Sequence, residues 1–432
     1  MAKRTVREDD TLCVHAGEER HGTNGPITTD VVHASVFVLD GVNEMRRVAE
    51  KKSSAYMYTR FGNPTTRVAE EKIAALEGGE DCVVTASGMA AILCAVLAVC
   101  KAGDEIVSML DIYGGTLSLF EKVFERFGVK TVFVPYQDMC RDNGLVAPGL
   151  RAGEDGSKTR PYIGKAGRGT APSPHKNGAH PIEKYFTKRT RMLFLETPTN
   201  PTLRCVDIEE LAAIGRKHGA CVVVDNTFAT PILQKPLWLG ADMSVHSGTK
   251  YLGGHSDVTA GAVVGSRELM ASVREMMKLS GGCLDPAASY LLIRGLKTLE
   301  LRVERACGNA TIIAEILREH PKVSRVYFPG LPDCEGHAAA RRQMKDFGMM
   351  VSFDTKGGGK AAERFIDRLR LWQLAPSLGG VESTVSYPLL SSHVGLSSKR
   401  LDLLGVSAGT VRLSVGIEHA ADLVEDLEQA LE

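Results

Sequence analysis

The middle of the chain alternates short apolar runs with longer helix-like segments. Runs bounded by Gly, Asp or Pro predict strands at residues 82–85, 105–109, 130–135, 191–195, 220–224, 243–246 and 260–264. Strands that are apolar on both faces are typical of a parallel sheet that helices cover on each side. The pattern therefore predicts a large α/β domain built on a mostly parallel sheet.

Different patterns flank this domain. Residues 1–64 hold few periodic elements, which indicates an extended arm of the kind that wraps a partner subunit. A helix is expected to follow it, since Val68, Ile73 and Leu76 share one helical face and Gly78 provides a stop. Helical tracts at 266–277 and 286–320 precede strand-like runs, which predict a smaller C-terminal α+β domain. The runs lie at 324–330, 348–355, 371–377 and 410–418.

These patterns divide the chain into an arm (1–64), a large domain (65–269) and a connecting helix with a C-terminal domain (270–432). A basic, Gly- and Pro-rich insertion interrupts the large domain at about residues 140–181. Residues 151–190 hold nine Lys or Arg against three Asp or Glu, without periodicity. A stretch of this kind is normally a surface excursion. A solvated loop, a lid and a contact for an acidic partner all remain open.

Composition narrows the class of protein. With 44% apolar and 24% charged residues the chain is typical of a folded globular protein. A formal net charge of zero gives no reason to expect nucleic acid or an anionic membrane as a partner. The longest apolar run, residues 89–100, is too short to span a bilayer and predicts a buried helix. The charged N-terminus predicts a cytoplasmic protein. The ten cysteines form no C-x-x-C pair, so neither a disulfide framework nor a metal site is expected.

Lys250 is the first candidate for chemistry. It follows the strand predicted at 243–246 and is flanked by Ser247 and Thr249. Ligands of open α/β sheets bind at the carboxyl ends of strands. A lysine at that edge, with hydroxyl groups that could bind a phosphate, suits a Schiff-base nucleophile. An ordinary surface lysine after a strand is the alternative.

Asp225 is the second candidate, because it closes the apolar run CVVVD at another strand end. A carboxylate in that position needs a cationic partner. The protonated nitrogen of a pyridine ring is one such partner, and the pair would make the ring an electron sink. The alternative is that Asp225 caps the helix that follows.

The segment at residues 83–99 predicts a strand, a turn at Ser87, Gly88 and Met89, and a helix. Glycine lets the backbone approach a ligand closely, and the N-H groups that begin a helix attract anions. The turn is therefore a candidate phosphate site, although strand-to-helix turns of this kind are common.

Further motifs accompany these residues in order along the chain. They are YTR at 58–60, GNPT at 62–65, ASGM at 86–89, YGGT at 113–116, ETPTNP at 196–201, DNT at 225–227, SGTKYLGGH at 247–255, RGLKTL at 294–299, SLGG at 377–380 and VRLS at 411–414. Over residues 10–138 and 181–420 the chain resembles the Cys/Met-metabolism, or transsulfuration, family of pyridoxal phosphate (PLP) enzymes. This family includes cystathionine γ-synthase, cystathionine γ-lyase and methionine γ-lyase. The resemblance implies PLP-dependent fold type I, the aspartate-aminotransferase-like fold.

The resemblance also implies roles for individual residues. Lys250 would bind PLP and shuttle protons, and Tyr113 would stack on the ring and assist proton transfer, so these two are the expected catalytic residues. Asp225 would pair with the ring nitrogen and Asn200 with the phenolic oxygen. The expected cofactor-binding set is Tyr58, Arg60, Ser87, Gly88, Met89, Tyr113, Asn200, Asp225, Ser247, Thr249 and Lys250.

Two residue pairs would extend the site beyond the cofactor. Tyr58 and Arg60 would reach the PLP phosphate of a neighbouring subunit, which implies a dimer with shared sites and, by the family pattern, a homotetramer. Ser377 and Arg412 would bind the substrate α-carboxylate, for which a guanidinium is apt. Arg412 alternates with the apolar Val411 and Leu413, so it is expected to face the cleft.

The expected reaction is γ-elimination at Cγ of a sulfur-containing or homoserine-derived L-amino acid, which releases 2-oxobutyrate and ammonia. The alternative is γ-replacement, as in cystathionine γ-synthase or O-acylhomoserine sulfhydrylase. A binding protein that merely kept the fold would have lost Lys250, Asp225 or Arg412, and all three are present. Residues 27–37, Pro376 and Gly115 depart from the family pattern and leave the substrate open.

Overall fold

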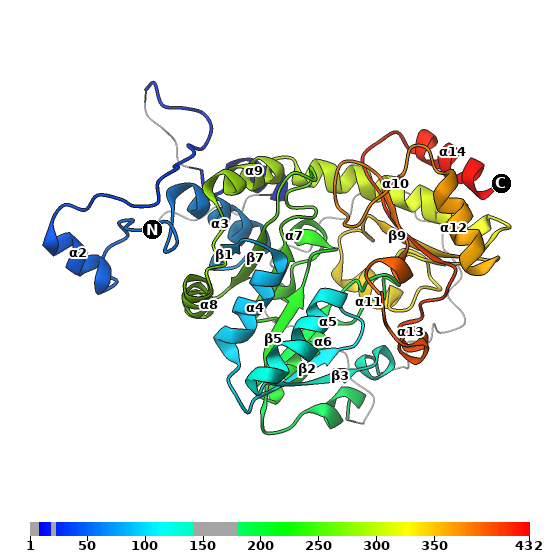
Figure 1. Ribbon diagram of the computed structural model, residues 1–432, viewed down its shortest axis with the longest axis horizontal. Helices are drawn as coiled ribbons and strands as arrows, with labels where there is room; N and C mark the ends of the chain where they lie inside the picture. The colour runs from blue at the N-terminus through cyan, green and yellow to red at the C-terminus, as the bar shows by residue number, and fades with distance from the viewer. Residues whose placement is uncertain (1–7, 19–22, 142–178) are drawn as a thin grey trace.

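Two β-sheets organise the chain, of which the computed structural model describes residues 8–18, 23–141 and 179–432 (Figure 1). The larger sheet has seven strands in the order β1-β7-β6-β5-β4-β2-β3. All seven predicted strands are confirmed, each to within one residue at either end. They are β1 (Asp81–Thr85), β2 (Glu105–Met109), β3 (Lys130–Val134), β4 (Thr190–Glu196), β5 (Cys221–Asp225), β6 (Met243–Ser247) and β7 (Gly261–Gly265).

This sheet is mostly parallel, as predicted, from β3 through β2, β4 and β5 to β6. Strand β7 runs antiparallel to both of its neighbours, β6 and β1. The connection from β6 to β7 contains no helix, and a strand that returns without a crossover helix lies beside its predecessor in the opposite direction. The carboxyl ends of β4, β5 and β6 therefore share one edge of the sheet.

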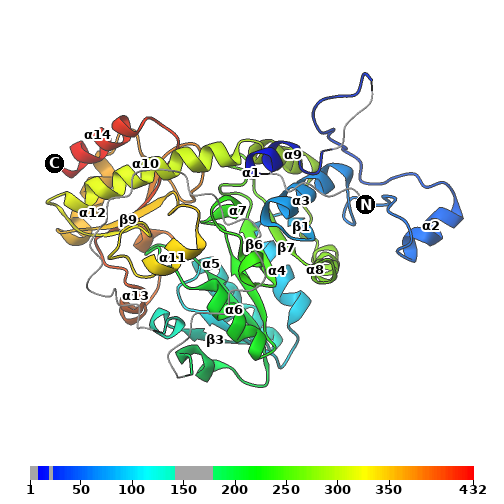
Figure 2. The ribbon, with the colours of Figure 1, turned by 180° about the vertical axis from the view of Figure 1, so that it is seen from behind.

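Helices cover both faces of this sheet (Figures 1 and 2). The predicted helix after residue 64 is confirmed as α3, which begins at an Asn63 cap and ends where Gly78 turns left-handed at φ 72°. The predicted buried helix is α4, whose core includes Ile92 and Val96. The helices of the N-terminal two thirds are α1 (Asp9–His15), α2 (Val42–Ala49), α3 (Pro64–Glu77), α4 (Gly88–Val99), α5 (Gly114–Lys122), α6 (Ile208–Lys217), α7 (Thr230–Leu233) and α8 (Arg267–Ser280).

The smaller sheet has five strands in the order β10-β11-β12-β9-β8. Its four predicted strands are confirmed as shorter elements, whereas β11 was not expected because three residues show no alternation. The predicted long helical tract is broken at Lys297 and Thr298 into α9 and α10, and α10 runs from the large sheet toward the small one (Figure 1). The division of the chain into three units stays a proposal.

The C-terminal third of the chain contains five strands and six helices among the described residues. The strands are β8 (Val323–Tyr327), β9 (Met350–Thr355), β10 (Gln373–Leu374), β11 (Thr384–Ser386) and β12 (Thr410–Ser414). The helices are α9 (Pro286–Leu296), α10 (Leu299–Glu319), α11 (His337–Gln343), α12 (Gly358–Arg368), α13 (Ser398–Leu404) and α14 (Ala420–Leu431). Five short 3₁₀ turns complete the described structure at Phe124–Phe127, Tyr136–Met139, Pro181–Tyr185, Pro236–Leu239 and Pro388–Leu390.

The N-terminal segment is less extended than predicted, because it contains α1 and α2. Helix α1 buries Cys13, and Lys72 of α3 donates hydrogen bonds to the carbonyls of Cys13 and Val14. Helix α2 buries no residue and lies apart from the body of the chain (Figures 1 and 2). Its i,i+3 pair Arg47–Glu44 gives it local support that the hydrophobic pattern does not reveal.

Three other expectations concern the whole chain. Residues 142–178, which hold most of the predicted basic insertion, lie outside the described residues. All ten cysteines are described, and none forms a disulfide. Across the described ranges no helix combines the length and the apolar character that a membrane crossing requires.

Candidate active site

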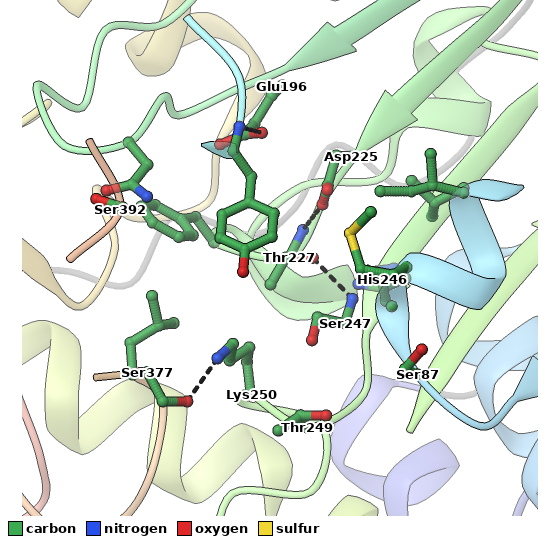
Figure 3. A pocket seen from close by; sticks show the side chains of 18 of the residues that line it. Ser87, Glu196, Asp225, Thr227, His246, Ser247, Thr249, Lys250, Ser377 and Ser392 are labelled. Atoms are coloured by element: carbon green, nitrogen blue, oxygen red, sulfur yellow. Dashed lines mark hydrogen bonds between the residues drawn. The ribbon is translucent and has the colours of Figure 1, made fainter. Parts of the chain in front are cut away.

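A cavity of about 390 Å³ lies at the carboxyl ends of β4, β5 and β6, beside strand β12 of the small sheet (Figure 3). Eleven of the thirteen predicted site residues line it, and Tyr58 and Arg60 do not. Its full lining is Ser87, Gly88, Met89, Ile92, Tyr113, Glu196, Asn200, Asp225, Thr227, Phe228, Val245, His246, Ser247, Thr249, Lys250, Pro376, Ser377, Leu378, Ser391, Ser392 and Arg412.

Lys250 follows β6 and points into this cavity, where its Nζ donates a hydrogen bond of 2.5 Å to Oγ of Ser377 (Figure 3). Burial, together with the positive charge of Arg412, lowers the pKa of Lys250 to about 8. The surface-lysine alternative is therefore wrong. An amine with this pKa is neutral in an appreciable fraction of molecules near pH 7, as a nucleophile must be.

Asp225 ends β5 and is buried at the cavity wall. Burial raises the pKa of its carboxyl group, whereas hydrogen bonding from Thr227 lowers it. The backbone N of Thr227 donates to Oδ1 at 3.0 Å. Asp225 does not cap helix α7, whose N-cap is Ala229. The carboxyl group is thus placed to receive a cation from the cavity.

The predicted phosphate turn begins α4. Ser87 is the N-cap, and its Oγ accepts a hydrogen bond from the backbone N of Ala90 at 3.1 Å. Gly88 is needed here, because a Cβ atom at that position would lie 2.9 Å from Cβ of Ser247. The close approach brings the helix N-terminus and Ser247 to one corner of the cavity, where an anion would meet free N-H groups.

Two hydroxyl residues support this corner. Oγ1 of Thr249, near the start of the connection from β6 to β7, forms hydrogen bonds with the backbone of Ala260 at the end of that connection. Thr227, which was not predicted, accepts a hydrogen bond from the backbone N of Ser247 through its Oγ1 at 2.9 Å. The DNT motif contained this threonine, but nothing in its spacing revealed the contact with β6.

Arg412 faces the cavity from β12, as its alternation with apolar neighbours predicted. Its Nη1 donates to Oδ1 of Asn200 at 2.8 Å and its Nη2 to the carbonyl of Ser377 at 2.9 Å. The buried Nε has no hydrogen-bond partner among the described residues. Ser377 has a positive φ of 92°, a strained conformation for a residue with a side chain. The strain turns its carbonyl to Arg412 and its hydroxyl to Lys250.

Tyr113 is 46% exposed and lies just before α5. Its backbone N donates to Oε2 of the buried Glu196 at 2.7 Å. Burial and the neighbouring Asp225 raise the pKa of Glu196 well above its usual value. Glu196 was not predicted as a site residue, although it opens the ETPTNP motif. A Cβ atom at Gly115 would lie 2.4 Å from the Tyr113 ring, so Gly115 leaves room for that ring.

Tyr58 and Arg60 lie outside the cavity of their own chain. Nη1 of Arg60 donates to the carbonyl of Lys278 at 2.7 Å, and its guanidinium lies over the ring of Phe61. Tyr58 is 39% exposed. Their expected contact with a second subunit is not tested by one chain and stays a prediction.

The profile of the family described as "Cys/Met metabolism PLP-dependent enzyme" matches residues 10–145 and 172–432. The chain belongs to this family. It is therefore a PLP-dependent enzyme, with the type I fold and with pyridoxal phosphate as its cofactor.

The similar proteins include both gamma-lyases and gamma-synthases. L-methionine gamma-lyase of Fusobacterium nucleatum subsp. polymorphum is 39% identical over 425 residues, which are 98% of this chain and 97% of that protein. Cystathionine gamma-synthase 1, chloroplastic, of Arabidopsis thaliana is 40% identical over 99% of this chain and 69% of its own length. A solved cystathionine gamma synthase of Xanthomonas oryzae pv. oryzae, in complex with aminoacrylate and cysteine, has a TM-score of 0.83 and 36% identity, and 98% of each chain is covered.

The residues of this chain fit the cofactor of the family. Lys250 would supply the amine for covalent attachment, and Asp225 would supply a buried carboxyl group that forms no ion pair with any described residue. The α4 N-terminus beside Ser247 offers the anion site that a phosphate needs. Asn200 and Tyr113 line the same cavity.

Proposed function

We propose that this enzyme eliminates the Cγ substituent of a sulfur-containing L-amino acid and releases 2-oxobutyrate and ammonia. The observation that carries the proposal is the charge distribution of the cavity. The Asp, Glu, His, Lys and Arg residues of its lining are Glu196, Asp225, His246, Lys250 and Arg412. The rest of the described lining, including Pro376, Ser391 and Ser392, is uncharged and suits an uncharged leaving group such as a thioether.

Arg412 would bind the substrate α-carboxylate. Its two Nη atoms already hold hydrogen bonds to Asn200 and Ser377, so the guanidinium is fixed before the substrate arrives. The unpartnered Nε gives it a further N-H for the carboxylate. This contact orients the Cα-H bond of the substrate toward Lys250.

Lys250 would carry the protons. PLP, held at Lys250 and paired with Asp225, supplies an electron sink that acidifies the bonds at Cα of the bound amino acid. The lysine amine, with a pKa of about 8, would accept the Cα proton, release it to the bound cofactor and, neutral again, accept a proton from Cβ. Tyr113 would donate a proton to the departing sulfur. Water then balances the reaction, so that one thioether substrate yields one thiol, one 2-oxobutyrate and one ammonia.

The alternative is γ-replacement, in which a thiol takes the place of the leaving group. Two of the similar proteins described above are named cystathionine gamma-synthase, and the solved one shares 36% identity. The two reactions share every residue assigned above. They differ in what happens after the leaving group departs.

An assay of the purified protein separates them. Methionine, cystathionine and O-acylhomoserines are supplied with and without cysteine, and 2-oxobutyrate and cystathionine are measured. The proposal expects 2-oxobutyrate from a sulfur amino acid without cysteine. Cystathionine formed from an O-acylhomoserine and cysteine, with no 2-oxobutyrate from methionine or cystathionine, would establish the alternative. Lys250→Ala serves as the inactive control in either case.

The proposal also concerns the oligomeric state and the cellular location of the protein. We propose a homo-oligomer whose sites are completed by Tyr58 and Arg60 of a neighbouring subunit, with a tetramer as the family pattern. Their position outside the cavity of their own chain, with Tyr58 exposed, supports this role. We also propose a cytoplasmic location, which the ten cysteines without a disulfide support.

A further inference from the structure

Arg302 is a buried arginine in the first turn of α10, and it is 8% exposed. Among the described residues it forms no ion pair. Burial lowers the pKa of its guanidinium to about 10, which still leaves it cationic near pH 7. A buried charge is costly unless other groups compensate it. The guanidinium therefore depends on neutral acceptors.

Three oxygen atoms accept hydrogen bonds from this guanidinium. Nη1 donates to the carbonyl of Tyr251 at 2.9 Å, and Nη2 donates to the carbonyl of Gly295 at 2.7 Å. Nε donates to Oγ1 of Thr298 at 3.2 Å. Gly295 and Thr298 lie on either side of the junction between α9 and α10, whereas Tyr251 directly follows Lys250. Arg302 thus joins this junction to the turn that carries the lysine.

That turn, after β6, is closed by its own backbone. The N of Lys250 donates to the carbonyl of Ser247 at 3.1 Å, and the N of Gly254 donates to the carbonyl of Lys250 at 2.8 Å. Gly254 has a φ of 73°, and a Cβ atom at this position would clash with Nη1 of Arg302. Arg302 therefore contacts the turn at Tyr251 and at Gly254, and each of these residues is linked directly to the backbone of Lys250.

Close packing fixes the turn from two sides. A Cβ atom at Gly295 of α9 would clash with the carbonyl oxygen of Gly253. On the other side a Cβ atom at Gly379 would lie 2.7 Å from the N of Tyr251. The backbone of the turn thus lies between α9 and the segment that follows β10, with little room to shift while Arg302 is in place.

We propose that Arg302 is a positioning residue that fixes the backbone of Lys250 and thereby aims the lysine amine at Cα of the bound substrate. The inference rests on the proton-transfer role proposed for Lys250. A long side chain transfers a proton only when its amine lies within reach of the reacting atom, and this depends on where its backbone is held. Because the other hydrogen bonds of Arg302 go to the α9–α10 junction, the position of the lysine depends on that junction.

The test measures proton transfer at Cα without elimination or replacement. The holoenzyme is incubated in heavy water with L-norleucine, an α-amino acid that has no leaving group on Cγ. Lys250 would take the proton from Cα, exchange it with solvent deuterium and return deuterium to Cα. Nuclear magnetic resonance follows the loss of the Cα-H signal. The result is therefore independent of which reaction at Cγ the enzyme performs.

Two variants remove the contacts of Arg302 in different ways. Arg302→Lys keeps the positive charge and loses the planar fork, and Arg302→Gln loses the charge as well. In both, the maximal exchange rate should fall by up to about 100-fold, the loss expected from a displacement of roughly 1 Å. The norleucine concentration at half of the maximal rate should stay the same, because Arg302 does not line the cavity. An unchanged exchange rate would overturn the inference.

Backbone hydrogen exchange of the holoenzyme gives a readout that does not depend on activity. Mass spectrometry follows the peptide that covers residues 247–255. The amides of Gly253 and Gly254 should exchange faster in both variants, because the turn that contains their hydrogen bonds is no longer held. Unchanged protection of this peptide would overturn the inference even if the Cα rate fell, since the turn would not have moved.

Lys72→Met is the matched control for a loss of stability alone. The side chain of Lys72 is also a buried cation, but it donates to the carbonyls of Cys13 and Val14, away from the turn. This variant should lower the melting temperature and leave both the Cα exchange rate and the protection of residues 247–255 unchanged. An equal fall in the Cα rate would show a general effect of instability and overturn the inference.

Lys250→Ala separates the two proposals. It should abolish exchange at Cα, and exchange at the unmodified rate would overturn the role of Lys250 itself. If Lys250→Ala is inactive and both Arg302 variants exchange normally, only the role of Arg302 is overturned.

Thr298→Val covers the case in which neither Arg302 variant folds. It keeps the arginine and removes only the acceptor of Nε. A smaller fall in the Cα rate is expected, together with faster exchange of the amide of Gly254. If both stay unchanged, the inference is overturned.

Discussion

Arg412 and Asn200 join the two sheets across the active site, with Nη1 of the arginine 2.8 Å from Oδ1 of the amide. Arg412 belongs to β12, and Asn200 lies in the loop after β4. Nη2 of the same guanidinium bonds to the carbonyl of Ser377. The proposed carboxylate-binding group is therefore held by residues of loops that follow strands of both sheets, before a substrate binds.

This bracing makes Arg412→Lys a severe change. An ammonium cannot reproduce the planar fork of a guanidinium. Hydrogen bonds to charged groups are worth about 1.5–3 kcal/mol each, so we expect kcat/KM to fall by about 100-fold or more. Steady-state kinetics on the best substrate measure the loss. Near-normal turnover, or strong activity on amines that lack a carboxylate, would contradict the substrate pose.

The pKa of Lys250 predicts how the cofactor-free protein reacts with acylating reagents. The neutral amine is the reactive form, so labelling of Lys250 should rise with pH to a midpoint at about 8, below the ordinary lysine value. Peptide mass spectrometry across a pH series measures it. In Arg412→Met the midpoint should move upward, because a nearby positive charge is removed. A midpoint at the ordinary lysine value in the unmodified protein would refute this.

The same shift has a consequence for stability. Between about pH 8 and the ordinary pKa of lysine, the unfolded chain holds a proton on Lys250 that the folded chain has lost. Stability rises with pH wherever the unfolded state binds more protons. Lys250 should therefore contribute stability that increases across this window in the cofactor-free protein. Denaturant unfolding measures the free energy of unfolding of the unmodified protein and of Lys250→Met. The value for the unmodified protein minus that for the variant should rise with pH across this window, and a constant value would disprove the prediction.

Gly115→Ala is expected to reduce turnover without loss of stability. The new Cβ atom would meet the Tyr113 ring at 2.4 Å, so the ring must move. Alanine inside a helix is more stable than glycine by about 0.5–1 kcal/mol, and Gly115 lies in α5. Kinetics and thermal melting measure both effects. Gly308→Ala in α10 is the matched control, since a Cβ atom there meets nothing within 4 Å and activity should be unchanged.

The shared-site proposal predicts complementation between two inactive variants. Arg60→Ala should weaken PLP retention, and Lys250→Ala should abolish turnover. When the two chains exchange in mixed oligomers, some sites contain both an intact Arg60 and an intact Lys250. Activity should return in those mixtures. Proven subunit exchange without recovered activity would show that the sites are not shared through Arg60.

Local sequence determined the strands of the large sheet and pointed to the first two candidate site residues. The seven strands of the large sheet followed from apolar runs between glycines, aspartates and prolines, because fully buried strands must be apolar on both faces. Asp225 was identified because it closes such a run, and Lys250 because it follows one. Ligands bind at that edge of an open sheet, so position along the chain was enough to suggest the site.

Tertiary structure decided what depends on contacts between distant residues. The antiparallel course of β7, the strained turn of Ser377 toward Lys250 and the hydrogen bond from Tyr113 to Glu196 have no local signature. The pair of Glu77 and His246 spans 169 positions, and each residue alone is an ordinary member of a helix or a strand. Their contact arises only when α3 packs against the sheet and buries both side chains.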